Sequence, residues 1–243
     1  MEFQLIHFYP DLMSLYGSYA NVTVLKRYLE RLGNNVAVET VRPGEAADLS
    51  GADFLFMGAG TERAARAAME DFARYGEAVR SAAGADTPML FAGTAMELLG
   101  EKVTEADGSS YAGLGLAGFA TVHGRTRIVG DVYGRTDLYP EAVVGFMNKC
   151  GDTAGVETPL LSSVEVGYGN RGPGTPEGFR WRNVLASELT GPILVKNPRL
   201  LETVAAAVYA RRGAALPEER SADLWAERGY AVTEQELRRR FAR

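Results

Sequence analysis

The chain has few side chains of the kind that perform covalent catalysis, because it contains one cysteine and two histidines. A thiolate attacks carbonyl carbon and an imidazole takes up and returns the proton, so Cys150 with His7 or His123 is one conceivable set. Lys149 is expected to lower the pKa of the neighbouring Cys150 thiol modestly. A lone cysteine is more often a small packed side chain, however. We expect His7 to be packed in the first strand and His123 to be exposed. These residues are too few for a zinc site at recognisable spacing.

An apolar strand that turns directly into a helix is predicted for residues 88–100 (PMLFAGTAMELLG). A strand that ends in small residues at such a turn has the architecture of a nucleophile elbow. The start of the helix offers free N–H groups to an anion. Gly93 stands at the turn, and a glycine has no side chain with which to attack a substrate.

A second glycine-containing loop follows an apolar strand at residues 58–60 (GAG), and Thr61 is a plausible N-cap for the next helix. Such a loop can cradle a phosphate. It lacks the G-x-G-x-x-G spacing and the acidic residue about 20 positions later that mark a dinucleotide site. The pattern therefore favours a tight strand–helix turn over a nucleotide site.

Alternating strands and helices must position these loops. Apolar, β-rich runs alternate with segments of helical spacing through the first hundred residues, which implies a mostly parallel sheet covered on both faces. We predict strands at 3–9, 36–41, 54–57 and 88–92, and helices at 18–32, 61–75 and 94–99.

The remainder of the chain changes character. Recurring glycines separate short β-like runs at 119–122, 127–132 and 143–147, which predicts antiparallel strands added to the sheet. Residues 167–178 form a predicted loop, residues 184–187 a last strand and residues 198–212 a helix. In the tail, residues 233–236 (TEQE) have a capping-box pattern that predicts the start of an arginine-rich terminal helix. Its arginines, Arg238–Arg240 and Arg243, are expected to form a solvated helix end, with a contact to a partner's acidic face as the alternative.

Composition excludes several classes of protein. The chain has 243 residues, a formal net charge of -5 and 46% hydrophobic residues, as expected of a globular protein without an electrostatic footprint for nucleic acid or anionic membranes. No secretion signal and no stretch of about 18 apolar residues is visible. One cysteine permits no internal disulfide, so the expected compartment is the cytoplasm.

Two blocks of the sequence resemble a known family. Residues 88–100 are similar to P-x-L-x-x-C-G-G-Y-Q-x-L-G, and residues 189–198 (LTGPILVKNP) to L-H-G-P-I-L-x-K-N-P, of the GatD-type glutaminase subunit of lipid II isoglutaminyl synthase. That group is related to the amidotransferase domains of cobyric acid synthases. In this resemblance the family's catalytic cysteine falls on Gly93 and its histidine on Thr190. The implied fold is the flavodoxin-like α/β fold of class I glutamine amidotransferases.

Further blocks fall in the same order along the chain. Residues 58–63 (GAGTER) resemble the family's oxyanion-hole loop, so Gly58, Ala59 and Gly60, together with Thr94, are implied to offer backbone donors that survive here. Residues 127–131 (RIVGD) resemble R-x-x-G-[DE], whose arginine implies a glutamine-binding role for Arg127. Residues 12–21, 144–148 and 167–170 also match. The resemblance covers about residues 3–212, and we expect one domain at 1–212 with a helical tail at 213–243.

The departures from the family's pattern concern the chemistry itself. Gly93 cannot form a glutamyl thioester, and the hydroxyl of Thr190 has no pKa near 7 with which to replace an imidazole. We therefore expect no glutaminase activity and no cofactor. The resemblance implies a scaffold or regulator of a Mur-ligase-like partner that amidates a peptidoglycan precursor. Two alternatives stay open: an enzyme reassigned to Cys150, and a module that binds a glutamine-like small molecule through Arg127 and the oxyanion loop.

Overall fold

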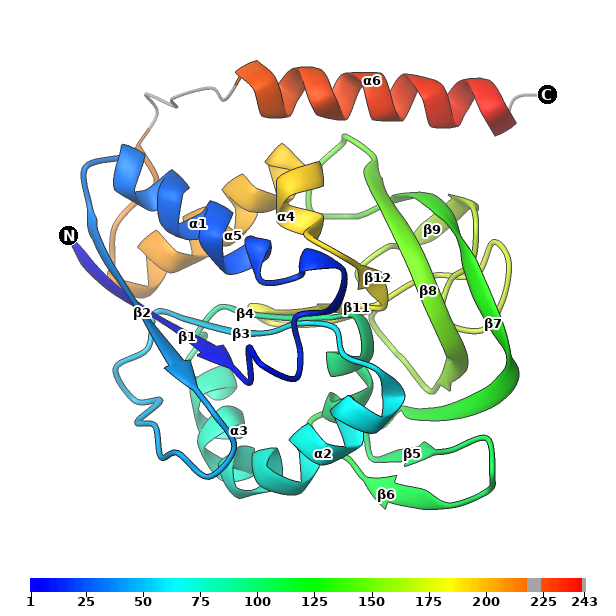
Figure 1. Cartoon of the computed structure of the whole chain (residues 1–243). Coiled ribbons are helices and arrows are strands. Elements are labelled where there is room, and N and C mark those ends of the chain that lie inside the picture. Colours follow the sequence, from blue (N-terminus) through cyan, green and yellow to red (C-terminus); the bar gives the residue numbers. More distant parts are fainter. Residues whose placement is uncertain (218–223, 242–243) are drawn as a thin grey trace.

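The computed structural model describes residues 1–217 and 224–241. A six-stranded sheet forms its centre, in the order β10-β11-β4-β3-β1-β2 (Figure 1). All neighbouring strands are parallel except β10 and β11. The strands are β1 (Glu2–Phe8), β2 (Asn35–Val41), β3 (Phe54–Met57), β4 (Met89–Ala92), β10 (Phe179–Trp181) and β11 (Val184–Ser187).

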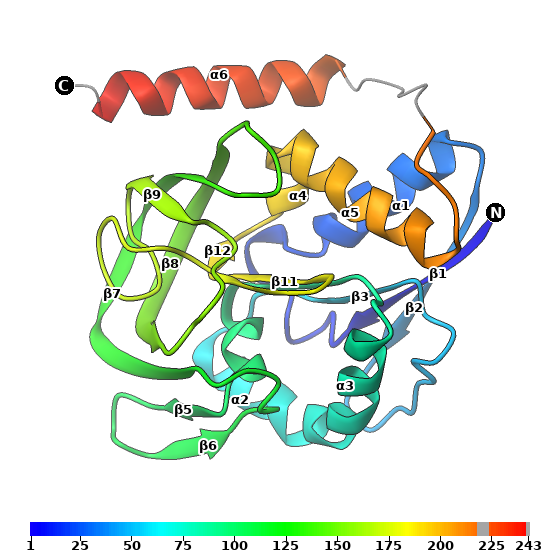
Figure 2. The ribbon, with the colours of Figure 1, turned by 180° about the vertical axis from the view of Figure 1, so that it is seen from behind.

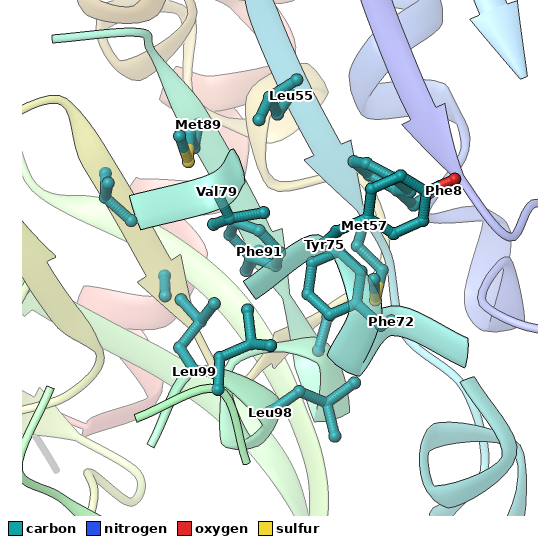
Figure 3. Packing of buried hydrophobic residues seen from close by; sticks show 14 of the residues in the cluster. Phe8, Leu55, Met57, Phe72, Tyr75, Val79, Met89, Phe91, Leu98 and Leu99 are labelled. Atoms are coloured by element: carbon teal, nitrogen blue, oxygen red, sulfur yellow. The ribbon is translucent and has the colours of Figure 1, made fainter. Parts of the chain in front are cut away.

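Helices cover both faces of this sheet, as the apolar strands require. Figures 1 and 2 show α1 (Ala20–Arg31), α4 (Ile193–Lys196) and α5 (Pro198–Arg211) over one face, with α2 (Glu62–Phe72) and α3 (Gly76–Gly84) over the other. The α2 side of the core contains an aromatic group that includes Phe8, Phe72 and Phe91 (Figure 3). The predicted α/β fold is confirmed, whereas α3 was not predicted.

The expected N-terminal caps explain where two of these helices begin. The Thr61 hydroxyl accepts a hydrogen bond from the Ala64 N–H at 3.1 Å and caps α2. Pro198 occupies the first turn of α5, where its missing N–H has no partner to lose. The predicted helix at 94–99 is wrong in type, because two short 3-10 turns, η3 (Gly93–Ala95) and η4 (Glu97–Leu99), stand there. Similar turns are η1 (Leu15–Gly17) and η2 (Ala73–Tyr75).

The middle of the chain forms a second sheet rather than additional strands on the first. Its order is β12-β8-β7-β5-β6, and β9 also pairs with β7. The antiparallel pairing of the two long strands β7 and β8 confirms the predicted strand type. The members are β5 (Lys102–Thr104), β6 (Ser110–Ala112), β7 (Ala120–Arg135), β8 (Val143–Ala154), β9 (Ser163–Val166) and β12 (Leu189–Thr190).

The tail contains one long helix, α6 (Leu224–Phe241), which lies across the ends of β7 and β8 (Figure 1). The predicted helix start at residues 233–236 is wrong: Thr233 lies inside α6 and its hydroxyl donates to the Gly229 carbonyl at 2.8 Å. Leu237 is buried against Tyr133, Ala142 and Val144. The predicted solvated arginines are only partly free in solvent, since Arg238 donates to the Tyr133 hydroxyl at 3.0 Å. Arg243 lies outside the described residues. None of the helices that the structure describes is long and apolar enough to cross a bilayer.

Candidate functional site

The loops singled out from the sequence meet at the carboxyl ends of the parallel strands, where open α/β sheets place their ligand sites. Gly93 follows β4, the loop of residues 58–60 follows β3, and the loop around Ser18 comes after β1. Hydrogen bonds join the three loops. Thr190 ends β12, and the next residue, Gly191, accepts a hydrogen bond of 3.3 Å from the Asn21 side chain, close to the loop around Ser18. Fold topology thus brings residues from four distant parts of the chain to one edge.

Gly93 keeps the backbone conformation of a strained turn, with φ at +63°. A side chain is disfavoured in this left-handed region. Space is also lacking, because a Cβ atom placed on Gly93 would lie 2.5 Å from the Cβ of Ala59. Ala59 stands where the resembling family has glycine. The volume next to the turn is therefore filled by the Ala59 methyl group, and a cysteine does not fit beside it.

The backbone donors of the oxyanion loop are bonded within the protein. The Ala59 N–H donates to the Ser18 hydroxyl at 3.0 Å, and the Gly60 N–H donates to the Thr94 hydroxyl at 2.9 Å. The Thr94 hydroxyl in turn donates to the Gly60 carbonyl at 3.1 Å. The expectation that these two donors stay available is wrong, because hydroxyl groups from neighbouring loops occupy them. Gly58 has no room for a side chain either, since a Cβ would collide with the Ser18 hydroxyl.

Thr190, at the position of the family's histidine, is buried, and its side chain contributes to the pairing of two strands. Its hydroxyl donates to the Phe146 carbonyl on β8 at 3.1 Å. The two residues are also paired across the β12–β8 ladder. A hydroxyl held in this way fastens two strands and offers no group that exchanges protons near neutral pH.

Arg127 lies at the rim of this site with its side chain 44% exposed. Its guanidinium donates to Glu62 and, at 3.0 Å, to the side-chain oxygen of Asn148. The Asn148 amide reaches the Tyr16 hydroxyl at 2.6 Å. Arg127 is thus already paired with a carboxylate of its own chain, which a ligand carboxylate would have to displace.

Cys150 lies beside the same pair, and its thiol is 3.4 Å from the Glu62 carboxylate. Burial, together with the negative charge of Glu62, raises the pKa of the Cys150 thiol to about 12. The expected help from Lys149 is absent, because the Lys149 ammonium is bonded to Glu188 and to backbone carbonyls. The thiolate needed for attack is therefore scarce at neutral pH.

The two histidines lie in different surroundings. His7 is buried in β1 against Phe56, with ring centroids 5.0 Å apart, as predicted for a packed residue. Burial lowers the pKa of His7 to about 4. His123 was expected to be exposed, and this is wrong: it is buried, with Nε2 2.7 Å from a Glu97 oxygen and Nδ1 3.5 Å from a Glu105 oxygen. Glu97 occupies the position of the family's glutamine. The acidic residue at that position was the one feature of the sequence that could have indicated the His123–Glu97 interaction.

Charge balance around His123 has a measurable consequence. Burial by itself lowers the pKa of His123, but the hydrogen bond and charge of Glu97, joined by Glu105, outweigh it and raise the pKa to about 9. The folded state thus holds this proton more tightly than the unfolded chain, whose histidine pKa is about 6.5. The stabilisation is complete below pH 6.5 and is lost as pH rises through 9.

We expect His123 to contribute about 3 kcal/mol to the fall in the free energy of unfolding between pH 6.5 and pH 9.5. Urea denaturation across this range measures it. The His123→Gln variant should show a clearly flatter pH dependence over the same interval, because it lacks this proton, whereas Glu177 and Glu188, whose pKa values burial raises, titrate in both proteins. Equal slopes for the two proteins would show that His123 does not carry the effect.

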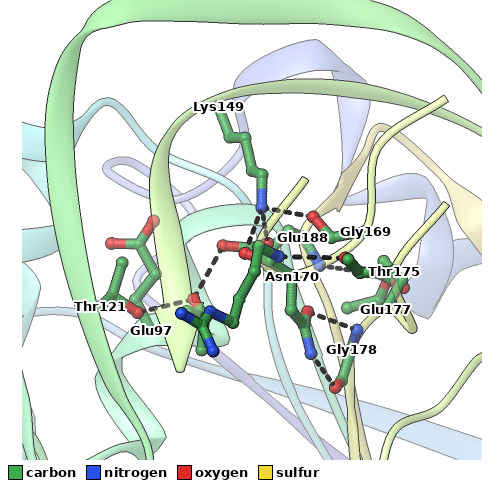
Figure 4. A network of polar contacts seen from close by, with 12 residues as sticks. Glu97, Thr121, Lys149, Gly169, Asn170, Thr175, Glu177, Gly178 and Glu188 are labelled. Carbon is green, nitrogen blue, oxygen red and sulfur yellow. Dashed lines mark hydrogen bonds and ion pairs between the residues drawn. The ribbon is translucent and has the colours of Figure 1, made fainter. Parts of the chain in front are cut away.

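A second buried polar network lies behind the site and was not predicted (Figure 4). The Lys149 ammonium donates to Glu188 and to the carbonyls of Gly169 and Asn170 at 2.8 and 3.1 Å. Glu188 also accepts from the Thr153 hydroxyl at 3.2 Å, and its N–H donates to Glu177 at 2.7 Å. These bonds fasten the loop of residues 167–178 to β8.

Burial sets the protonation of the carboxyl groups in this network. It raises the pKa of Glu177 to about 7, although the Glu188 N–H and Lys149 act in the opposite direction. Burial also raises the pKa of Glu188 in spite of the adjacent lysine. Among the residues that the structure describes, no group of three or more His, Cys, Asp or Glu side chains is placed to hold a metal ion.

Comparisons with known proteins agree with the motif blocks. Residues 4–198 match the CobB/CobQ-like glutamine amidotransferase domain. The chain is 28% identical to the subunit GatD of lipid II isoglutaminyl synthase (glutamine-hydrolyzing) from Staphylococcus aureus, over 87% of this chain and 86% of that protein. It is 30% identical to the GatD subunit from Streptococcus pneumoniae, over 82% of this chain and 77% of that protein.

Solved structures support the fold alone, since their sequence identities are low. PurLQS from Thermotoga maritima has a TM-score of 0.51 at 14% identity and covers 87% of this chain and 97% of its own. A glutamine amidotransferase has a TM-score of 0.50 at 18% identity, with 84% and 98% covered. Sequence match, relatives and architecture agree, and the chain therefore belongs to the family of CobB/CobQ-like glutamine amidotransferase domains.

Proposed function

We propose that this chain is a non-catalytic subunit of the GatD type, located in the cytoplasm, which acts as a scaffold or regulator of a Mur-ligase-like partner in the amidation of a peptidoglycan precursor. The observation that carries the proposal is the filled site: the Ala59 methyl group takes the space beside Gly93, and two hydroxyls take the N–H groups of Ala59 and Gly60. Tetrahedral intermediates need such donors free.

The similarity of this chain to the two GatD subunits supports a role with a partner protein. Both relatives are named as subunits of an enzyme, and their similarity to this chain extends over more than four fifths of it. A subunit that does not hydrolyse glutamine needs neither a nucleophile nor a base. A role in an assembly requires the fold, and the similarity covers most of the chain. The two other functions have less support: the Cys150 thiol has a raised pKa, and Arg127 is paired with Glu62.

We expect no release of glutamate from glutamine above background, either by the chain alone or after co-expression with a Mur-ligase-like protein. A coupled glutamate dehydrogenase assay measures this, with the Staphylococcus aureus subunit GatD and its partner as the active comparison. The Cys150→Ser variant should behave as the parent chain does. Turnover that disappears in Cys150→Ser would overturn the proposal in favour of a relocated nucleophile.

The scaffold role has its own test. Size-exclusion chromatography of the co-expressed proteins should yield a stable complex of the chain with the ligase-like protein. A chain that elutes alone at micromolar concentration, while binding glutamine in a thermal-shift titration, would instead favour the small-molecule module.

A further inference from the structure

The loop of residues 167–178 is anchored to the rest of the molecule near both of its ends (Figure 4). Near the first end, the Lys149 ammonium of β8 donates to two backbone carbonyls of the loop at 2.8 and 3.1 Å. Near the second end, the Glu177 carboxyl group accepts from the Glu188 N–H at 2.7 Å. An ion pair between Lys149 and Glu188 joins the two anchors. Three buried ionisable side chains thus take part in holding the loop.

The loop also has hydrogen bonds of its own, which contain no ionisable group. The Asn170 side chain donates to the Gly178 carbonyl at 2.9 Å and accepts from the Gly178 N–H at 2.8 Å. Backbone bonds connect the loop to its surroundings at the Thr153 N–H, which donates to the Asn170 carbonyl at 2.8 Å, and between Leu161 and Glu177. The loop can therefore detach as one unit when its anchors weaken.

The charges of the buried anchor groups do not balance. Lys149, Glu177 and Glu188 are each at most 3% exposed, so that one ammonium group faces two carboxyl groups. Glu97 of η4 adds further negative charge beside Glu188 and is itself paired with His123. The other hydrogen bonds to the two carboxyl groups come from hydroxyl and amide groups, which are neutral. A buried carboxyl group without a cation of its own normally keeps its proton.

The position of this proton couples pH to the state of the loop. Burial raises the pKa of Glu177 to about 7 and that of Glu188 to about 8. A glutamic acid in water has a pKa of about 4.3. The closed loop therefore binds a proton that the same groups release once the loop opens to water. The ratio of closed to open loop falls as pH rises from about 4.3 towards 8.

We propose that residues 167–178 form a proton-controlled flap, which is closed while Glu177 and Glu188 share a proton and opens to water more often once that proton is lost. Opening lets water solvate both carboxylates. Gly167 and Tyr168 line a hollow of about 220 Å³ against β7 and β8, so the flap determines the shape of this face of the second sheet. The inference is independent of the proposed function, because it needs only contacts within the chain.

Hydrogen–deuterium exchange of the full chain at pH 5.5 and pH 8.5 tests the flap. The reporters are the amides of Thr153 and Glu188, which donate to the Asn170 carbonyl and to the Glu177 carboxyl group in the closed loop. We expect their protection factors, corrected for the intrinsic pH dependence of exchange, to fall at least tenfold between the two pH values. One proton changes the ratio by up to about tenfold per pH unit. Protection that stays within threefold would refute the flap.

Glu177→Gln copies the protonated state, because its amide group can accept from the Glu188 N–H and donate to the Ser187 hydroxyl. The protection factors of this variant should change less than threefold, since Glu188 then faces Lys149 without a second carboxylate. Glu157→Gln is the matched control, because it removes one exposed carboxylate and should keep the full response of the parent. A response of Glu177→Gln as large as that of the parent would show that the carboxyl pair does not control the loop.

Carbon-13 NMR of the glutamate carboxyl groups gives a second readout that needs no variant. At least one glutamate signal of the parent should titrate above pH 6.5. If every glutamate carboxyl group titrates below pH 5.5, the pair holds no proton at neutral pH and the flap is refuted.

Discussion

Gly93→Cys is expected to lower the free energy of unfolding by about 3 kcal/mol, because it combines a crowded contact with an unfavourable backbone conformation. The new Cβ would lie 2.5 Å from the Ala59 Cβ, and φ at Gly93 is +63°. Urea denaturation followed by circular dichroism measures the loss. Such a loss would mean that the site is closed by its packing, so that one substitution does not return the missing nucleophile.

Two further variants separate the crowding from the backbone strain. Ala59→Gly combined with Gly93→Cys should recover about half of the loss, because it removes the methyl group that the new side chain meets. Gly115 has nearly the same φ, +60°, and no atom lies within 4 Å of the place that a Cβ would take, so Gly115→Cys should cost only about 1 kcal/mol. If Gly93→Cys is as stable as the parent, Ala59 does not fill the site as described.

Lys149→Met is expected to lower the free energy of unfolding by about 3–5 kcal/mol, the usual cost of removing one partner from a buried ion pair. The substitution leaves Glu188 without its cation and the carbonyls of Gly169 and Asn170 without a donor. Both ionic side chains are at most 3% exposed, so water does not replace the lost bonds. Denaturant unfolding at pH 9.5, above the raised pKa of Glu188, measures the effect.

The deficit of Lys149→Met should shrink as pH falls, because protonation of Glu188 removes the uncompensated charge. Burial raises the pKa of that carboxyl group to about 8 even beside Lys149, so without the lysine the change begins above that pH. Lys26→Met is the matched control: Lys26 pairs with Glu30 on the exposed face of α1, and its loss should cost less than about 0.5 kcal/mol. A Lys149→Met deficit below about 1 kcal/mol would contradict a structural role for the network.

The substitutions at the site are consistent with one another. The loops that follow β1, β3 and β4 pack closely against one another. Gly93 lies against Ala59 of the facing loop, and two hydroxyl groups accept the hydrogen bonds of the oxyanion-loop N–H groups. Nearby, the Glu97 carboxylate forms an ion pair with the buried His123. A site that had merely lost its nucleophile would keep open space and free donors. Packing of this kind supports a chain retained for its shape.

The order of elements was largely predictable from local patterns. The strands β3 and β4 are short and wholly apolar, and helix α1 has its apolar residues at helical spacing, so burial and secondary structure coincide there. Prediction failed where local signals compete. Residues 233–236 look like a helix start, but α6 has already formed upstream and is held by Leu237 against β7 and β8.

The sequence by itself determined the family and the absence of a cysteine and a histidine at Gly93 and Thr190, because these follow from residue identity and order. Only the tertiary structure decided what surrounds them. Ala59 fills the space beside Gly93, and His123 is buried between two glutamates. The Lys149 ammonium pairs with Glu188 rather than with its neighbour Cys150. All of these contacts join residues at least 18 positions apart in the chain.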